Sequence, residues 1–155
     1  MKVKSTSKEL AKYLLPLLLL AAALGLAVRP ALAGDGGRPF ETALSGAAEA
    51  PGPGDADGSG TAEISLNQGQ GRVCFSLEVS GIGSATAAHI HAAPAGVPGP
   101  VVVPLAPPTS GSSSGCVSGV DAALIKAIRQ NPQLYYVNVH NAEFPGGALR
   151  GQLSK

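Results

Sequence analysis

The clearest pattern in the sequence is a strict alternation of apolar and polar residues from Arg72 to Ser80. Val73, Phe75 and Leu77 fall on one side of an extended chain, and Cys74 falls on the other. A period of two predicts a β-strand with one buried face. Shorter runs bounded by turn residues predict five further strands, at residues 40–45, 61–67, 86–91, 134–141 and 148–153.

The segments between these runs are rich in glycine, proline and small polar residues, which favour turns. Residues 49–60 predict a loop, and residues 144–147 predict a hairpin between the last two strands. Residues 92–108 are a proline-rich stretch with three valines embedded in it, and residues 111–115 predict a flexible Gly/Ser loop. Short strands separated by such turns are typical of all-β sandwiches and barrels.

A single segment has helical periodicity. Leu124, Ile125 and Ile128 form an apolar stripe, and Asp121 stands where it can cap the first turn. The Asn131-Pro132 pair then stops the helix. The pattern predicts one short helix over residues 121–130 in a mainly β chain.

The N-terminus has the three parts of an export signal. Four lysines within residues 2–12 precede a mostly apolar run at residues 13–28, and Ala31-Leu32-Ala33 matches a signal peptidase site. A membrane anchor is the alternative, but the run is shorter than the roughly 20 residues of a spanning helix and contains Pro16. We expect a signal peptide at residues 1–33, a short segment at 34–39 and one domain at 40–155.

Removal of this signal changes the charge of the chain. The precursor has a formal net charge of +1, from 11 basic and 10 acidic residues. The signal contains five of the basic residues and one of the acidic residues, which leaves a net charge of about −3. The remaining cations are scattered, so neither a nucleic-acid footprint nor a basic membrane patch is expected. We expect a secreted, periplasmic or cell-envelope protein that is free of the membrane after cleavage.

The chain has two cysteines, Cys74 and Cys116. Outside the cytoplasm such a pair predicts a disulfide. Two soft metal ligands are the alternative, but neither cysteine has another cysteine or a histidine nearby in the sequence. Because Cys74 lies on the outward side of its strand, we expect the disulfide to pin a loop containing Cys116 over the outside of the sheet.

The three histidines of the chain are the best candidates for chemistry. His89 and His91 are two residues apart, so on a strand both rings leave the same face. Val137 and Val139 are the natural core residues of a later strand, which turns His140 outward. Imidazoles converging in this way suit copper or zinc. Exposed polar residues, or histidines that hydrogen-bond to loop carbonyls, are the alternatives.

Two residues near His140 extend this prediction. Asn138 lies on the same outward face and is expected to support the ligands from beside them. Arg150 is expected to lie across the hairpin from His140, where its cation would attract a small anion to a metal. Asp55 and Asp57 resemble the start of a calcium loop, but the later acidic ligands are missing, so a solvated turn is favoured.

Two blocks of sequence resemble the CHRD (chordin) domain. They are Ala87-Ala88-His89-Ile90-His91 with Gly99-Pro100-Val101, and residues 136–153 from Tyr136 to Leu153. The resemblance runs from about residue 40 to residue 153 and implies an antiparallel, immunoglobulin-like β-sandwich. It also implies an extracellular setting and, by comparison with chordin, a possible extracellular protein partner.

The order of His89, His91, His140 and Arg150 along the chain is similar, more distantly, to that of copper–zinc superoxide dismutase. It implies a superoxide dismutase-like sandwich in which His89, His91 and His140 are copper ligands and Arg150 guides an anion. The chain has no further histidine for a zinc bridge, so no zinc site is expected. We therefore expect an exported CHRD-domain protein that binds copper. A superoxide dismutase-like enzyme and a non-catalytic protein-binding module are the alternatives.

Overall fold

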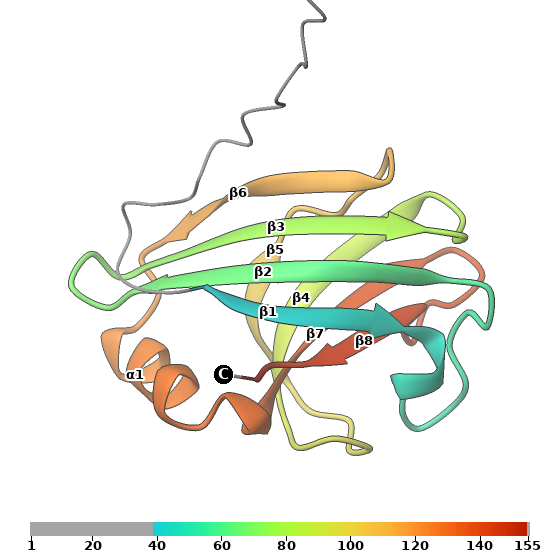
Figure 1. Ribbon diagram of the computed structural model, residues 1–155. Helices are drawn as coiled ribbons and strands as arrows, with labels where there is room; N and C mark the ends of the chain where they lie inside the picture. The colour runs from blue at the N-terminus through green and yellow to red at the C-terminus, as the bar shows by residue number, and fades with distance from the viewer. Residues whose placement is uncertain (1–38, 155) are drawn as a thin grey trace, which may run out of the picture. The chain divides into compact units, whose positions relative to one another are not determined.

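We describe residues 39–154 of a computed structural model of the chain. This part contains eight strands, one α-helix and two short 3-10 turns (Figure 1). The strands are β1 (Phe40–Ser45), β2 (Ser59–Asn67), β3 (Arg72–Ser80), β4 (Ala85–Ala92), β5 (Val101–Leu105), β6 (Ser112–Ser118), β7 (Tyr135–Asn141) and β8 (Leu149–Gln152). The helix is α1 (Ala122–Gln130), and the turns are η1 (Gly46–Ala48) and η2 (Pro132–Leu134).

The strands form one antiparallel sheet in the order β5-β4-β7-β8-β1-β2-β3-β6. The sheet curls on itself, so that β6, β3, β2 and β1 form one layer, β8 lies next to β1, and β4, β5 and β7 cross behind (Figure 1). The two edge strands of the sheet, β5 and β6, approach each other. The Ser113 hydroxyl in β6 donates to the carbonyl of Ala106, directly after β5, at 2.8 Å. The prediction of a mainly β, sandwich-like fold with one helix is confirmed, in the form of a single, nearly closed sheet.

The core lies between the two layers. Ile64, Phe75, Ile90 and Val137 are all buried there, and each belongs to the apolar set of an alternating strand. Helix α1 adds Ile125 and Ile128 to this core. The Asp121 side chain caps the helix by accepting a hydrogen bond of 2.8 Å from the Ala123 amide, as predicted.

Two segments rich in turn residues form strands, and the prediction of a flexible Gly/Ser loop is wrong. The valines inside the proline-rich stretch begin strand β5, which pairs with β4, and the Gly/Ser stretch expected to be a flexible loop lies largely within strand β6. Glycine and serine in β6 have low β-propensity, and Pro100 and Pro104 flank the β-favouring valines of β5. Pairing with an already strong neighbour, β4 or β3, provides the hydrogen bonds that make each segment extended.

The predicted disulfide between Cys74 and Cys116 is confirmed, but its expected setting is wrong. Cys116 does not lie in a loop over the sheet; it belongs to β6 and stands directly opposite Cys74 on β3. The disulfide therefore joins two neighbouring strands at one end of the sheet order. A disulfide of this kind fits an oxidising compartment.

The predicted signal peptide at residues 1–33, and residues 34–38 of the short segment after it, lie outside the described residues. Within residues 39–154, no helix is both long and apolar enough to cross a membrane.

Candidate metal centre

Strand β4 directs His89 and His91 to the outer side of the sheet. Ala88 and Ile90, the residues that alternate with them, are 1% and 0% exposed and point into the core. Because Ala88 and Ile90 are buried in the core, the two imidazoles between and after them point outward, as their spacing predicted.

Strand β7 supplies the third histidine in the same way. Val137 and Val139 are fully buried, so His140 leaves the outer side of the sheet. β7 is the hydrogen-bonded neighbour of β4, with Asn138 opposite His89 and His140 opposite Ala87. His140 is thus diagonal to His89 across the strand pair, within reach of its ring.

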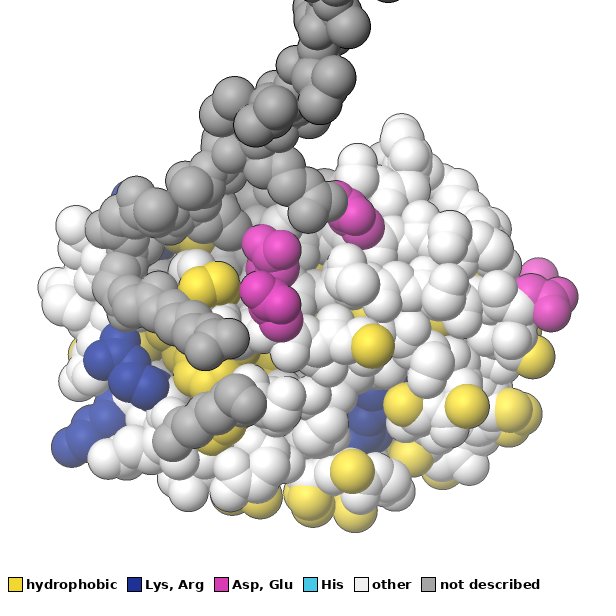
Figure 2. All heavy atoms as spheres, in the orientation of Figure 1, with side chains coloured by type: hydrophobic (Ala, Val, Ile, Leu, Met, Phe, Trp, Pro, Cys, Tyr) yellow, Lys and Arg dark blue, Asp and Glu magenta, His cyan; other side chains and the backbone are white. Residues whose placement is uncertain are grey.

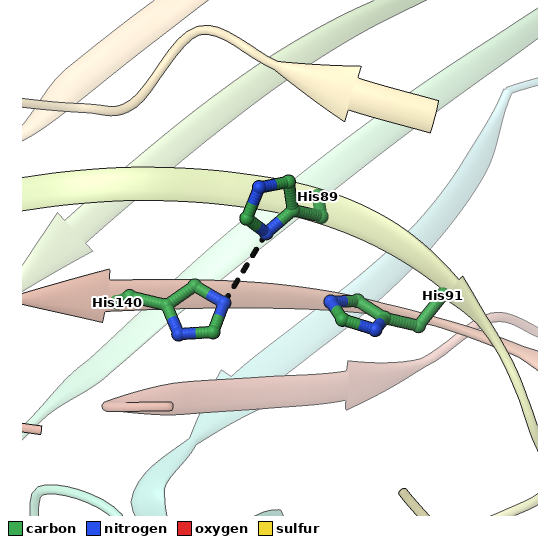
Figure 3. A group of neighbouring side chains, drawn as sticks. All are labelled: His89, His91 and His140. Carbon is green, nitrogen blue, oxygen red and sulfur yellow. Dashed lines mark hydrogen bonds between the residues drawn. The ribbon is translucent and has the colours of Figure 1, made fainter. Parts of the chain in front are cut away.

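The structure brings the three predicted ligands together. One ring nitrogen from each histidine lies within 4.8 Å of the others. His89 Nδ1 and His140 Nε2 are 3.2 Å apart, and the His91 ring approaches them from farther along the strand (Figure 3). Two nitrogens bound to one tetrahedral ion at about 2.0–2.1 Å lie roughly 3.3 Å apart. This group of histidines could therefore hold a metal ion.

Backbone carbonyls orient two of the rings. His91 Nδ1 donates to the Gly99 carbonyl at 2.8 Å, and His140 Nδ1 donates to the Pro145 carbonyl at 3.0 Å. Because a carbonyl only accepts, the proton of each neutral ring is on Nδ1 and Nε2 carries a lone pair. Metal-binding histidines commonly donate a hydrogen bond of this kind from the ring nitrogen that does not bind the metal.

The environment favours uncharged imidazoles, which metal binding requires. Burial lowers the pKa of His89, and the neighbouring His140 and His91 lower it further. Burial is also the main cause that lowers the pKa of His91, although its hydrogen bond to Gly99 opposes the change. Both rings are therefore neutral at neutral pH.

One buried atom tests whether the residues fit a metal ion. His91 is 9% exposed, and its Nε2 has no hydrogen-bond partner among the described residues. A buried polar atom without a partner is costly in a folded protein. A metal bound on this side of the ring would use that lone pair, so the donor set fits a metal ion of the copper or zinc type.

Arg150 does not lie where we expected it. The β7–β8 register centres the hairpin on Phe144, one residue earlier than predicted, so Arg150 stands opposite Asn138 rather than His140. The side chain is on the outer side of the sheet, yet it is 1% exposed. Its terminal nitrogens donate to the Pro94 and Val97 carbonyls, which belong to the loop after β4. Anion guidance stays a prediction that this burial does not favour.

Asn138 lies beside the histidines but bonds to none of them. Its amide nitrogen donates to a carboxyl oxygen of Glu49, and its Oδ1 has no hydrogen-bond partner within residues 39–154. Burial raises the pKa of Glu49 to about 7, against the attraction of Arg150 and the hydrogen bonds from Ala50 and Asn138. The supporting role expected for Asn138 stays a prediction.

Sequence reasoning missed three residues around the site. Gly99 carries the carbonyl that holds His91, Tyr136 stacks on the His91 ring, and Glu49 reaches Asn138 from another loop. Gly99 and Tyr136 both stood in the motifs on which the family resemblance rests, so those motifs were the available signal. No local pattern indicated Glu49, because its contact spans 89 residues of sequence.

The fold and the histidine cluster define an all-β domain with a candidate metal centre on the outer side of its sheet. The family model of the CHRD domain matches residues 40–153, and the chain belongs to this family. No curated protein and no solved structure matches the chain, so these comparisons add no support to the more distant similarity to superoxide dismutase.

Proposed function

We propose that the chain is an exported CHRD-domain protein that binds one copper ion through His89, His91 and His140. The supporting observation is the convergence of three imidazole nitrogens within 4.8 Å. The cluster contains histidines and no carboxylate, and imidazole suits copper and zinc better than magnesium or calcium. Copper is preferred to zinc because a given nitrogen site generally binds Cu²⁺ more tightly than Zn²⁺.

The export part of the proposal is supported by the N-terminal pattern and the disulfide. Removal of residues 1–33 would give a chain that begins at Gly34. The intact mass of the protein recovered outside the cytoplasm tests this directly. A mass that includes residues 1–33, or recovery from the cytoplasm alone, would contradict export.

Metal analysis tests the copper site. The purified, disulfide-bonded protein is loaded with Cu²⁺, passed over a desalting column and analysed for metal and protein. We expect one copper per chain, and its loss in His140→Ala. Glu63→Gln, which removes a carboxylate from the outer side of β2, is the matched control and keeps its copper. A ratio well below one, or unchanged copper in His140→Ala, would overturn the proposal.

A second candidate function, a protein-binding module, is favoured by one observation. Val97, in the loop after β4, and Val101, which is paired with His91, are 45% and 49% exposed. Exposed large apolar side chains are a common feature of contact surfaces. This function predicts that a variant with all three histidines replaced keeps its extracellular partner, whereas Val97→Ser with Val101→Ser loses it. Pull-down of envelope or extracellular proteins with both variants distinguishes the two functions.

A further inference from the structure

Arg150 is the only lysine or arginine of the described residues that is buried. Its guanidinium donates to neutral acceptors: the Val97 carbonyl at 3.0 Å, the Pro94 carbonyl at 2.8 Å and the Gln152 side-chain oxygen at 3.3 Å. These bonds hold the cation in place without cancelling its charge. Glu49 is the acid that attracts it. Burial raises the pKa of this carboxyl to about 7, so it is only partly ionised at neutral pH and offsets only part of the arginine charge.

Tyr136 connects this cation to the histidine cluster. The Arg150 Cζ lies 3.5 Å from the centroid of the Tyr136 ring. The His91 ring stacks on the same tyrosine, with centroids 4.7 Å apart and planes 9° from parallel. β7 carries the tyrosine between β4 and β8, so His91 and Arg150 reach it from opposite sides. The result is a three-layer stack that ends at a proposed metal ligand.

The stack is also tied together at its edge. The Gly99 amide donates to the Tyr136 hydroxyl at 3.2 Å, and the carbonyl of the same glycine accepts from His91 at 2.8 Å. Arg150 in turn holds the Pro94 and Val97 carbonyls of this loop. The position of the charge relative to His91 is therefore fixed by the fold rather than by a mobile side chain.

Resting on the proposed copper site, we infer that Arg150 determines which ions the site prefers, by favouring monovalent copper over divalent ions. A fixed positive charge repels a bound cation in proportion to the charge of that cation. The binding of Cu²⁺ and of Zn²⁺ is therefore weakened twice as much as the binding of Cu⁺, when the affinities are compared on a logarithmic scale. Three imidazoles supply no negative charge that would offset this repulsion.

The size of the effect follows from the distance. With an effective dielectric of about 20, two unit charges roughly 10 Å apart change each other's binding by about tenfold. Loss of the arginine charge is thus expected to strengthen Cu⁺ binding up to about tenfold and Cu²⁺ or Zn²⁺ binding up to about a hundredfold. The Cu⁺/Cu²⁺ affinity ratio is expected to fall by up to about tenfold.

The experiment measures the affinities of three ions by competition with chelators: Cu⁺ under anaerobic conditions, Cu²⁺ and Zn²⁺. Arg150→Met removes the charge from a side chain of similar length, and it leaves the Pro94 and Val97 carbonyls on an exposed loop that water can reach. Arg150→Lys keeps the charge. Arg129→Gln, which removes a cation that bonds to the Leu66 carbonyl instead, is the matched control.

A fourth variant changes the charge in the opposite direction. Glu49→Gln removes a carboxylate near Arg150 while its side-chain oxygen can still accept from Asn138. At pH 8, where this carboxylate is ionised, the variant is expected to bind Cu²⁺ and Zn²⁺ more weakly, with a smaller effect on Cu⁺. This variant decides the matter if Arg150→Met does not fold.

The outcomes separate the inference from the copper proposal on which it rests. A wild-type protein that binds neither copper ion overturns both. A wild-type protein that binds copper, with Arg150→Met and Glu49→Gln each shifting Cu⁺ and Cu²⁺ equally or not at all, overturns the role of Arg150 alone. Opposite shifts in the two variants, with Cu²⁺ and Zn²⁺ moving together, support it.

Discussion

Two outer surfaces of the sheet can be compared: one on β4 and β7, the other on β1, β2 and β3. The strands of both have the same alternation of apolar and polar residues. On β1 and β2, Glu41 and Glu63 stand opposite each other, Glu41 is exposed, and acidic side chains gather on this face (Figure 2). On β4 and β7, the polar residues converge under loops that contribute carbonyls to His91 and His140. Alternation alone therefore directs side chains outward, and the covering loops turn one of these surfaces into a candidate site.

The disulfide offers the largest test of this contrast. Replacing Cys74 and Cys116 with alanine together opens a loop between residues 42 positions apart, which is expected to lower the free energy of unfolding by about 4 kcal/mol on the chain-entropy model. Because the bond joins β3 and β6, metal affinity of the folded variant is expected to be unchanged. Urea unfolding and metal titration measure the two quantities. Ser114→Ala on β6 is the control, and a parallel loss of metal affinity would show that the two regions are coupled.

Gly99→Ala tests the loop that covers the histidines. A Cβ at this position would lie 2.2 Å from the Ala92 carbonyl oxygen, so the loop must move and carry the Gly99 carbonyl away from His91. We expect metal affinity to fall about 10- to 100-fold, as for other losses of a contact behind a ligand. A Cβ at Gly146 meets nothing within 4 Å, so Gly146→Ala is the matched control. Equal metal affinities in the two variants would show that the loop does not help to position His91 for metal binding.

Glu49 provides a smaller test through pH. The pKa of this carboxyl is raised from its usual 4.5 to about 7 on folding, so the folded state holds the proton more tightly. The stability that this proton contributes is present below about pH 4.5 and is lost as the pH rises through about 7. Glu49→Gln is therefore expected to be more stable than the wild type by about 1 kcal/mol at pH 8, allowing for solvent screening, and to match it near pH 4.5.

Chemical denaturation across this pH range measures the difference. The lowered pKa values of His89 and His91 make both proteins less stable as the pH falls below about 6.5, so this effect cancels in the comparison. Glu143→Gln, which removes an exposed carboxylate from the β7–β8 loop, is the control. Identical pH profiles for Glu49→Gln and the wild type would contradict the prediction.

A helix-cap variant with an equally small expected effect calibrates the others. Asp121→Ala removes the cap from the Ala123 amide and is expected to cost about 1 kcal/mol of stability, with no change in metal affinity. Thermal unfolding and metal titration measure both. If a general loss of stability of this size also weakened the metal site, the effect of Gly99→Ala could not be assigned to the loop.

Much of the fold followed from local pattern. The apolar alternation of β3 and the cap at Asp121 each depend on neighbouring residues, and both predictions are confirmed. The segment around Cys116 carries no such pattern, because its strand depends on pairing with β3 from more than thirty residues away. Sequence alone could therefore place the strong strands and not the weak ones that complete the sheet.

The candidate site divides in the same way. The spacing of His89 and His91 and the valines around His140 were enough to predict that the rings leave the outer side of the sheet. Burial of Arg150 could not be predicted, because it depends on a loop that folds back over β8 and on a strand register two residues from the expected one. Contacts that join distant segments, such as Glu49 with Asn138, have no local signature.

The carbonyls of Gly99 and Pro145 have one more consequence. They hold two imidazoles in place through protein contacts alone, so the orientation of these two rings would not depend on a bound metal ion. Uptake and release would then require only a small local adjustment of protons, not refolding of the chain. Such an arrangement would suit repeated exchange of the proposed metal ion with the surroundings, in contrast to domains that fold only around their metal.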